Sequence, residues 1–219
     1  FIFHLSFLKL KLHETFLESF KSIKEVVLGR PEFIITEIVV NIDNKILKQE
    51  IIAVVDIHFP VNSLTLNLEE TRRKIKKLTG VKNVAVSVDN LGKLIVTAVE
   101  RQPAIINKVG PKYFLLDKDG FLVNEVSSRS ERPDLPLFMG EGLEKKIEEG
   151  LKLLLDMGPH ASRVNALTWV GNRRWDITFD KVRVIKLPSY NPRESIRRII
   201  SLDFEFNILT SDVLTIDLR

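Results

Sequence analysis

The stretch "NRRWDITF", residues 172–179, indicates how the C-terminal half of the chain folds. Trp175, Ile177 and Phe179 alternate with polar residues, and this period of two predicts a strand with one buried face. Turn signals flank the strand, and neighbouring apolar positions extend it into a three-stranded meander: Val164, Trp169, Val182, Val184 and Leu187. An inward Trp175 would bury a large area, so core packing explains the tryptophans better than a ligand site does.

Further strands and two helices are predicted around this meander. Residues 112–126 contain two apolar runs that flank the hairpin signal "DKDG". A proline-containing loop and a helix follow, and the helix carries apolar residues on one side: Leu143, Ile147, Leu151 and Leu154. Asn191, Pro192 and Glu194 then supply the N-cap, first-turn proline and capping-box acid of another helix. The chain closes on a predicted strand, "VLTIDLR". Residues 102–219 are therefore expected to form a mixed α/β domain with a largely antiparallel sheet and helices on one face.

The preceding residues predict a smaller β-α-α-β-β unit over positions 33–101, so the fold class is α+β. The run "FIITEIVVNID" feeds a helix that Asp43 or Asn44 can cap, and "NLEETRRKIKKLTG" provides a second helix. "VAVSV" and "LIVTAV" then form a hairpin around "DNLG". Residues 1–32 form a separate segment in which an amphipathic helix is expected from four apolar positions: Phe16, Phe20, Ile23 and Val27.

Composition limits the classes of function. The chain has 219 residues, of which 44% are hydrophobic and 28% charged, enough for the cores of two small domains. Its formal net charge of +4 is mild and fits an anionic membrane surface as readily as nucleic acid. Cysteine is absent, which excludes disulfides, thiolate metal sites and cysteine nucleophiles. The first residue is Phe1, so we expect the chain to begin inside a longer product, and no stretch reaches the roughly 18 apolar residues of a membrane span.

Sequence motifs for catalysis, metals and cofactors are missing. The four histidines are scattered, "DKDG" lacks the later oxygen ligands of a calcium loop, and there is no GxSxG or phosphate-binding glycine loop. We therefore expect no enzyme activity, no metal and no cofactor. The basic run over residues 72–77 is interpreted as a solvated helix face, with lipid headgroups and nucleic acid as alternatives. Arg173 and Arg174 differ, because an exposed guanidinium pair can hold the carboxylate of a partner.

Several motifs of this chain resemble those of one bacterial cell-division family, FtsQ, which is called DivIB in Gram-positive organisms. "YFLLDKDGFLV", "LPLFMG", "RRWDITF", "KLP" and "IDLR" follow one another in the order typical of that family's β domain. The β-α-α-β-β unit looks like the family's POTRA domain, and "ERQPA" looks like its hinge. The resemblance covers Phe33 to Arg219.

The resemblance implies a single-pass protein of the inner membrane, whose transmembrane helix is missing from this chain and whose residues 1–32 lie near the membrane on the periplasmic side. It implies a non-enzymatic divisome scaffold that binds FtsB and FtsL type partners, with no small-molecule substrate and no nucleic acid. In the family a partner segment adds a strand at the C-terminal edge of the β domain. The expected partner-binding residues are thus Thr215, Asp217 and Arg219, with Arg173 and Arg174 of the "RRW" motif. The family continues past "DLR" with another strand, whereas this chain stops there.

Two other functions remain open at this level. The first unit alone is also typical of POTRA chaperones in outer-membrane protein biogenesis or secretion, which carry tandem units or a following barrel. A basic nucleic-acid module is the third possibility, and it predicts salt-dependent binding to DNA.

Overall fold

The computed structural model describes residues 30–211 and 213–219. These residues fall into two compact units that divide between Glu100 and Arg101. The amphipathic helix expected around Phe16, Phe20, Ile23 and Val27 lies outside the described residues. Within the described part of the chain, no helix is both long enough and apolar enough to cross a bilayer.

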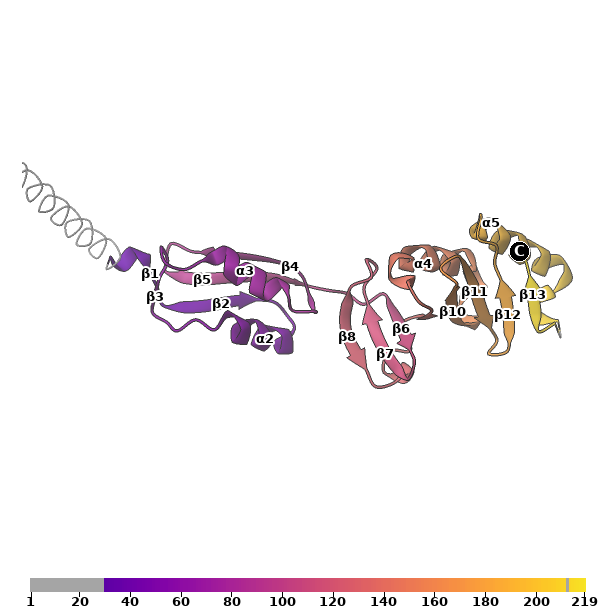
Figure 1. The fold of residues 1–219 in the computed structure, drawn as a ribbon, viewed down its shortest axis with the longest axis horizontal. Helices are drawn as coiled ribbons and strands as arrows, with labels where there is room; N and C mark the ends of the chain where they lie inside the picture. Colours follow the sequence, from indigo (N-terminus) through magenta and orange to yellow (C-terminus); the bar gives the residue numbers. More distant parts are fainter. Residues whose placement is uncertain (1–29, 212) are drawn as a thin grey trace, which may run out of the picture. The chain divides into compact units, whose positions relative to one another are not determined.

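The first unit is a three-stranded sheet with two helices (Figure 1). Its elements are η1 (Pro31–Phe33), β1 (Ile34–Ile35), β2 (Glu37–Asn41), α2 (Lys45–Val55), β3 (Val61–Asn62), α3 (Leu68–Lys76), β4 (Val81–Val88) and β5 (Lys93–Glu100). The sheet order is β2-β5-β4, with β2 parallel and β4 antiparallel to the central β5. This confirms the β-α-α-β-β order. The first predicted strand is divided at Thr36, because β1 pairs with β3 while β2 pairs with β5.

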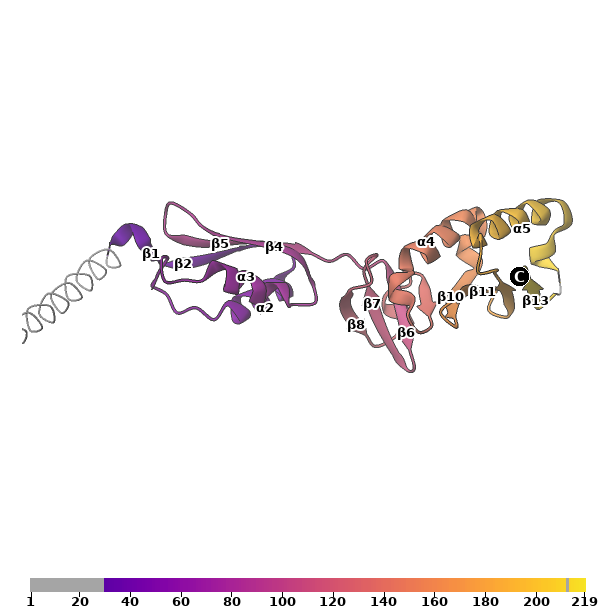
Figure 2. The same cartoon turned by 45° about the horizontal axis from the view of Figure 1, so that its top comes forward.

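Local side-chain caps and one apolar face account for the helices of this unit. The Asn44 side chain accepts the N–H groups of Ile46 and Leu47 at 3.0 and 3.1 Å, and thereby begins α2. The Asn67 side chain accepts the N–H of Glu70 at 2.9 Å at the start of α3. Both helices cover the same side of the sheet (Figure 2), where they enclose a core that includes Leu47, Ile51, Val55, Ile75, Val84, Leu94 and Val96.

The second unit is built on an eight-stranded sheet of order β13-β12-β11-β10-β9-β6-β7-β8. Its strands are β6 (Ile105–Val109), β7 (Lys112–Leu116), β8 (Leu122–Val126), β9 (Leu137–Met139), β10 (Val164–Val170), β11 (Arg174–Phe179), β12 (Arg183–Lys186) and β13 (Thr215–Asp217). Its helices are η2 (Arg129–Glu131), η3 (Leu143–Lys145), α4 (Ile147–Asp156), η4 (Gly158–Arg163), α5 (Pro192–Phe206) and η5 (Ile208–Thr210). The two α-helices lie on one face of the sheet (Figure 2).

A tryptophan-centred core joins these helices to the sheet. Trp175 is fully buried, with ring centroids 5.4 Å from Phe138 and 5.1 Å from Trp169. Gly150 of α4 allows this packing, because a Cβ at that position would lie 2.5 Å from the Phe138 ring. The sequence-based interpretation of the tryptophans as core residues is therefore confirmed.

The expected loop before α4 contains a strand. β9 lies between β6 and β10 and runs parallel to both, so residues 137–139 join two parts of the sheet that are distant in sequence. Three of the seven strand pairings, β6·β9, β9·β10 and β12·β13, are parallel. Parallel pairing of this kind leaves no local turn signal, which is why the sequence pattern suggested a loop.

Not all the apolar positions of the third meander strand are buried. Val182 lies just before β12 and is 67% exposed, whereas Arg183, Ile185 and Leu187 are buried. Side chains alternate along a strand, so the burial of Ile185 and Leu187 on the core face carries Arg183 inward with them.

The expected side-chain cap at Asn191 is wrong. Asn191 adopts a left-handed conformation with φ 50°, and its amide donates to Glu194 Oε2 at 3.4 Å.

Candidate binding edge at the C-terminal strand

β13 is the outermost strand at one end of the eight-stranded sheet (yellow in Figure 1). It pairs with β12 in parallel, with Thr215 opposite Val184 and Asp217 opposite Lys186. Among the described residues no strand pairs with its other side. A row of backbone donors and acceptors therefore faces away from the described sheet, as on any edge strand.

The hydrogen bonds to β12 define which backbone groups face outward. The Val184 N–H donates to Leu214 O at 2.9 Å, and the Leu218 N–H donates to Lys186 O at 3.0 Å. Successive residues of a strand direct their backbone groups to opposite sides, so Leu214 and Leu218 face β12 while Thr215 and Asp217 face the open side. The N–H and C=O groups of Thr215 and Asp217 are thus the pairing groups of this edge.

An ion pair between Asp217, the last residue of β13, and Arg219 lies at the C-terminal end of the edge. Arg219 Nε lies 2.8 and 3.0 Å from the two carboxylate oxygens of Asp217, and a second guanidinium nitrogen lies 2.5 Å from Oδ2. The Arg219 N–H also donates to Asp217 Oδ1 at 3.1 Å. Hydrogen bonding to Arg219 is the main reason that the pKa of Asp217 falls well below its usual range, and the same contact raises the pKa of Arg219. The pair is therefore charged on both sides at neutral pH.

Charged side chains form a row on the polar face of the sheet beside this edge. Asp176, Lys186 and Asp217 stand opposite one another on β11, β12 and β13. Arg174 Nε lies 3.2 Å from Asp176 Oδ1. Because Arg174 and Arg219 each lie two residues from a member of the row, the structure brings them to the same end and face of the sheet.

The opposite, helix-facing side of the edge contains a groove of about 340 Å³. Its walls come from α5 and from the residues at the end of the chain: Ser195, Arg198, Ile199, Leu202, Asp217, Leu218 and Arg219. Leu218 packs against the core cluster and gives the groove an apolar floor. The side chain of Arg198 makes no hydrogen bond or ion pair with any described residue. The groove thus combines apolar surface with an unneutralised cation.

Not all the expected site residues come together. Thr215, Asp217 and Arg219 lie on the edge, and Arg174 lies two strands away on the same face. Arg173 is exposed in the turn between β10 and β11, where its backbone N–H donates to Val170 O at 3.1 Å. Sequence reasoning placed Arg173 and Arg174 together, but Arg173 lies in the turn, whereas Arg174 begins β11 and pairs with Asp176.

The other end of the sheet is less suited to pairing. β8 is its edge strand, and the Glu125 N–H is occupied by the Asn124 side chain at 2.9 Å. A register shift between Leu115 and Leu116 of β7 further disturbs the ladder beside it. Side-chain bonding and bulges are common ways to block an edge. The β13 edge is therefore the better candidate.

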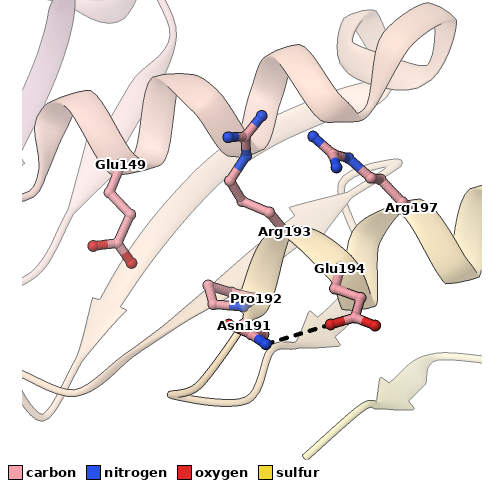
Figure 3. Close-up of a pocket in the computed structure, with 6 residues that line it drawn as sticks. All are labelled: Glu149, Asn191, Pro192, Arg193, Glu194 and Arg197. Carbon is pink, nitrogen blue, oxygen red and sulfur yellow. Dashed lines mark hydrogen bonds between the residues drawn. The ribbon is translucent and has the colours of Figure 1, made fainter.

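A second hollow, of about 370 Å³, lies between α4 and the start of α5 (Figure 3). In Figure 3 the Arg193 and Arg197 side chains extend toward α4, and there Asp156 accepts bonds from Arg193 at 2.5 and 3.0 Å and from Arg197 at 3.0 and 3.2 Å. The bond from Arg193 is the main cause of a lowered pKa of Asp156. These cations are already neutralised, so the hollow is a helix–helix contact. Within the described ranges, no group of three or more His, Asp or Glu residues is placed to hold a metal.

Sequence reasoning missed Arg183 and the walls of the groove. Arg198, Ile199 and Leu202 gave no signal as site residues, because their meeting with Leu218 depends on how α5 packs. Arg183 had a detectable signal, since it lies two residues before Ile185 and four before Leu187, and side-chain alternation places all three on the same side of a strand.

Comparison with known proteins gives one consistent family. The model of the C-terminal domain of the cell division protein FtsQ/DivIB matches residues 104–219. The chain is 36% identical over 190 residues to the cell division protein FtsQ of Cereibacter sphaeroides, and equally so to that of Roseobacter litoralis. These matches cover 87% of this chain but 62% and 65% of the relatives, so the chain spans less than two thirds of their length.

One solved structure is also similar. The major extracytoplasmic domain of DivIB from Geobacillus stearothermophilus matches with a TM-score of 0.31 at 9% identity. The match covers 50% of this chain and 96% of that domain, a likeness too slight to bear on the site.

Proposed function

Because the chain belongs to the FtsQ/DivIB family of cell division proteins, we propose that it is a non-enzymatic scaffold of the division machinery that binds its partners along the β13 edge. Residues 33–101 act as its POTRA domain and 102–219 as its β domain, with 1–32 near the membrane. The partners are FtsB and FtsL type membrane proteins. A transmembrane helix in the longer protein anchors it in the inner membrane, with this chain on the periplasmic side.

The observation that carries this proposal is the open edge itself. An extended partner segment can bond the outward N–H and C=O groups of Thr215 and Asp217, as in other cases of strand addition. These backbone bonds supply affinity, while the alternating side chains of the added strand supply specificity.

The two faces of the edge suggest the chemistry of that added strand. On the polar face Arg219 and Arg174 are paired with Asp217 and Asp176, and Lys186 stands between these two acids, so this face favours polar or charged side chains that can bond to the row. On the other face the groove between α5 and Leu218 favours an apolar side chain, with Arg198 at its rim. The proposed partner segment is therefore an extended strand with polar or charged residues on one face and apolar residues on the other.

Depletion of the protein in its own organism tests the cellular role. We expect filamentous cells with unfinished septa, and rescue by the full-length gene. Normal division after depletion would contradict the scaffold role. Normal division with reduced levels of outer-membrane proteins would instead support the POTRA chaperone alternative.

Binding of the purified chain to the extracytoplasmic segment of the FtsB-type partner tests the site. We expect a complex that an excess of DNA does not displace. Failure to bind that segment, with a folded chain, would contradict the proposed partner.

A further inference from the structure

A buried arginine beneath the edge connects β12 to the segment that leads into β13. Arg183 is only 8% exposed, although β12 is the last strand but one of the sheet. Its Nε donates to Val213 O at 2.7 Å, and its other nitrogens donate to the carbonyls of Leu209 and Ser211. One guanidinium therefore bonds alternate carbonyl groups along this connecting segment.

The same segment is held from a second direction. Arg163 donates to Leu209 O at 3.0 Å and pairs with Asp180 at 2.6 Å, and Arg183 also reaches Asp180 at 3.3 Å. Asp203 Oδ1 accepts the Leu209 N–H at 2.5 Å. The backbone of Leu209 is thus bonded on both sides by side chains from other elements.

β13 needs such support because its own pairing is short. It has three residues and a single neighbouring strand, and isolated short pairings are marginal in water. Bonds from a charged donor are among the stronger hydrogen bonds in proteins. Removal of the Arg183 guanidinium would take the side-chain donor from the carbonyls of Ser211 and Val213, and one of two donors from that of Leu209, so the connecting segment would lose its attachment to β12.

We infer that Arg183 is a positioning residue for the binding edge. It touches no partner and acts by fixing the backbone at Leu209, Ser211 and Val213, and through them β13, at the side of β12. This inference rests on the proposed function only in taking the β13 edge as the binding site. The placement of β13 itself is a property of the free chain. An arginine thereby occupies an inward position where the neighbouring inward residues, Ile185 and Leu187, are apolar.

Hydrogen exchange of the free 219-residue chain tests the inference without any partner. In Arg183→Met, we expect the amides of residues 209–219 to exchange about tenfold faster or more, while β10 and β11 keep their protection. Lys152→Met on α4 is the control, since it also removes one cation and lies outside this cluster. Unchanged exchange at residues 209–219 would overturn the inference. Equal loss of protection in β10 and β11 would also overturn it, because Arg183 would then support the whole core.

A covalent rescue separates positioning from direct contact. Val184 and Thr215 are opposite one another, and the chain has no cysteine, so Val184→Cys with Thr215→Cys can join β12 to β13 by one disulfide. Arg183→Met should weaken binding of the FtsB-type segment, and adding the cysteine pair should restore it to the level of the cysteine pair alone. Failure of oxidation to restore binding would overturn the positioning role. If no variant binds, the wild type included, the proposed partner fails while the exchange result still decides the role of Arg183.

Discussion

Replacement of Thr215 by proline is the perturbation that isolates the backbone of the edge. The Thr215 N–H faces the open side, so its loss removes no bond to β12. Proline is tolerated on edge strands where the missing N–H faces solvent, and it favours the extended conformation in the residue before it. We therefore expect Thr215→Pro to change the free energy of unfolding by less than about 0.5 kcal/mol.

The effect on partner binding should be much larger. The complex would lose one hydrogen bond, worth about 1 kcal/mol, and one partner carbonyl would be left unpaired at a further cost of about 1 kcal/mol. The proline ring would also project toward the added partner strand, which would lie about 4.8 Å from β13. A loss of about 2 kcal/mol corresponds to a dissociation constant raised about 30-fold.

Isothermal titration with the extracytoplasmic segment of the FtsB-type partner measures this change. Thr215→Val serves as the comparison, because it keeps the N–H and the branched shape and replaces only the hydroxyl. We expect Thr215→Pro to bind far more weakly than Thr215→Val. Equal affinities of the two variants, with both chains folded, would refute pairing through the backbone of Thr215.

Other predictions concern the stability of the second unit. Trp175→Ala should lower the free energy of unfolding by about 3–5 kcal/mol, measured by urea denaturation, because the ring is fully buried against Phe138; a loss below about 1 kcal/mol would contradict this packing. Gly150→Ala should cost about 1–3 kcal/mol in the same assay, because its Cβ would meet that ring at 2.5 Å, and an unchanged unfolding midpoint would count against the contact. Asp156→Asn should destabilise at pH 7, because the paired carboxylate has a lowered pKa. That contribution is present above the ordinary value of about 3.9 and is lost as pH falls through the folded pKa, so the two chains should converge in acid, and a pH-independent difference would refute the ion-pair explanation.

The first unit could be predicted well because its signals are local. Asn44 and Asn67 cap their helices as the sequence indicates, and the two strands of the hairpin flank an evident turn. The same is true of the core tryptophans, whose alternation with polar residues is visible in the sequence. Where a residue's environment depends on its neighbours in the chain, pattern and propensity are enough.

The rest depends on contacts that have no local signal. β9 is placed by parallel pairing with two strands that are distant in sequence, and Gly140 after it adopts φ 120° where a side chain would clash with Trp169 O. In and beside β12, Val182 and Val184 point to one side of the strand and Ile185 and Leu187 to the other. The packing of the core determines which pair is buried. Arg183 was therefore not recognised as a buried residue.

Part of the candidate edge could be predicted from the sequence. A terminal strand with Thr215, Asp217 and Arg219 was expected from the closing motif, and among the described residues no strand pairs with the outer side of β13. The sequence does not predict the pairing of Asp217 with Arg219, because it depends on side-chain rotamers. It does not predict the groove under α5 either, because that depends on how the helix is placed. Arg173 and Arg174 illustrate the limit, since adjacency in sequence says little about a shared face.

Protection of individual amides in the complex is the most direct test of the central claim that partners pair with the β13 edge. The measurement is residue-resolved hydrogen exchange by NMR, with and without the FtsB-type segment. Strand addition predicts that the outward N–H groups of Thr215 and Asp217 gain strong protection on binding, while Glu125 on the opposite edge is unchanged. A saturated complex in which Thr215 and Asp217 exchange as fast as in the free chain would contradict it.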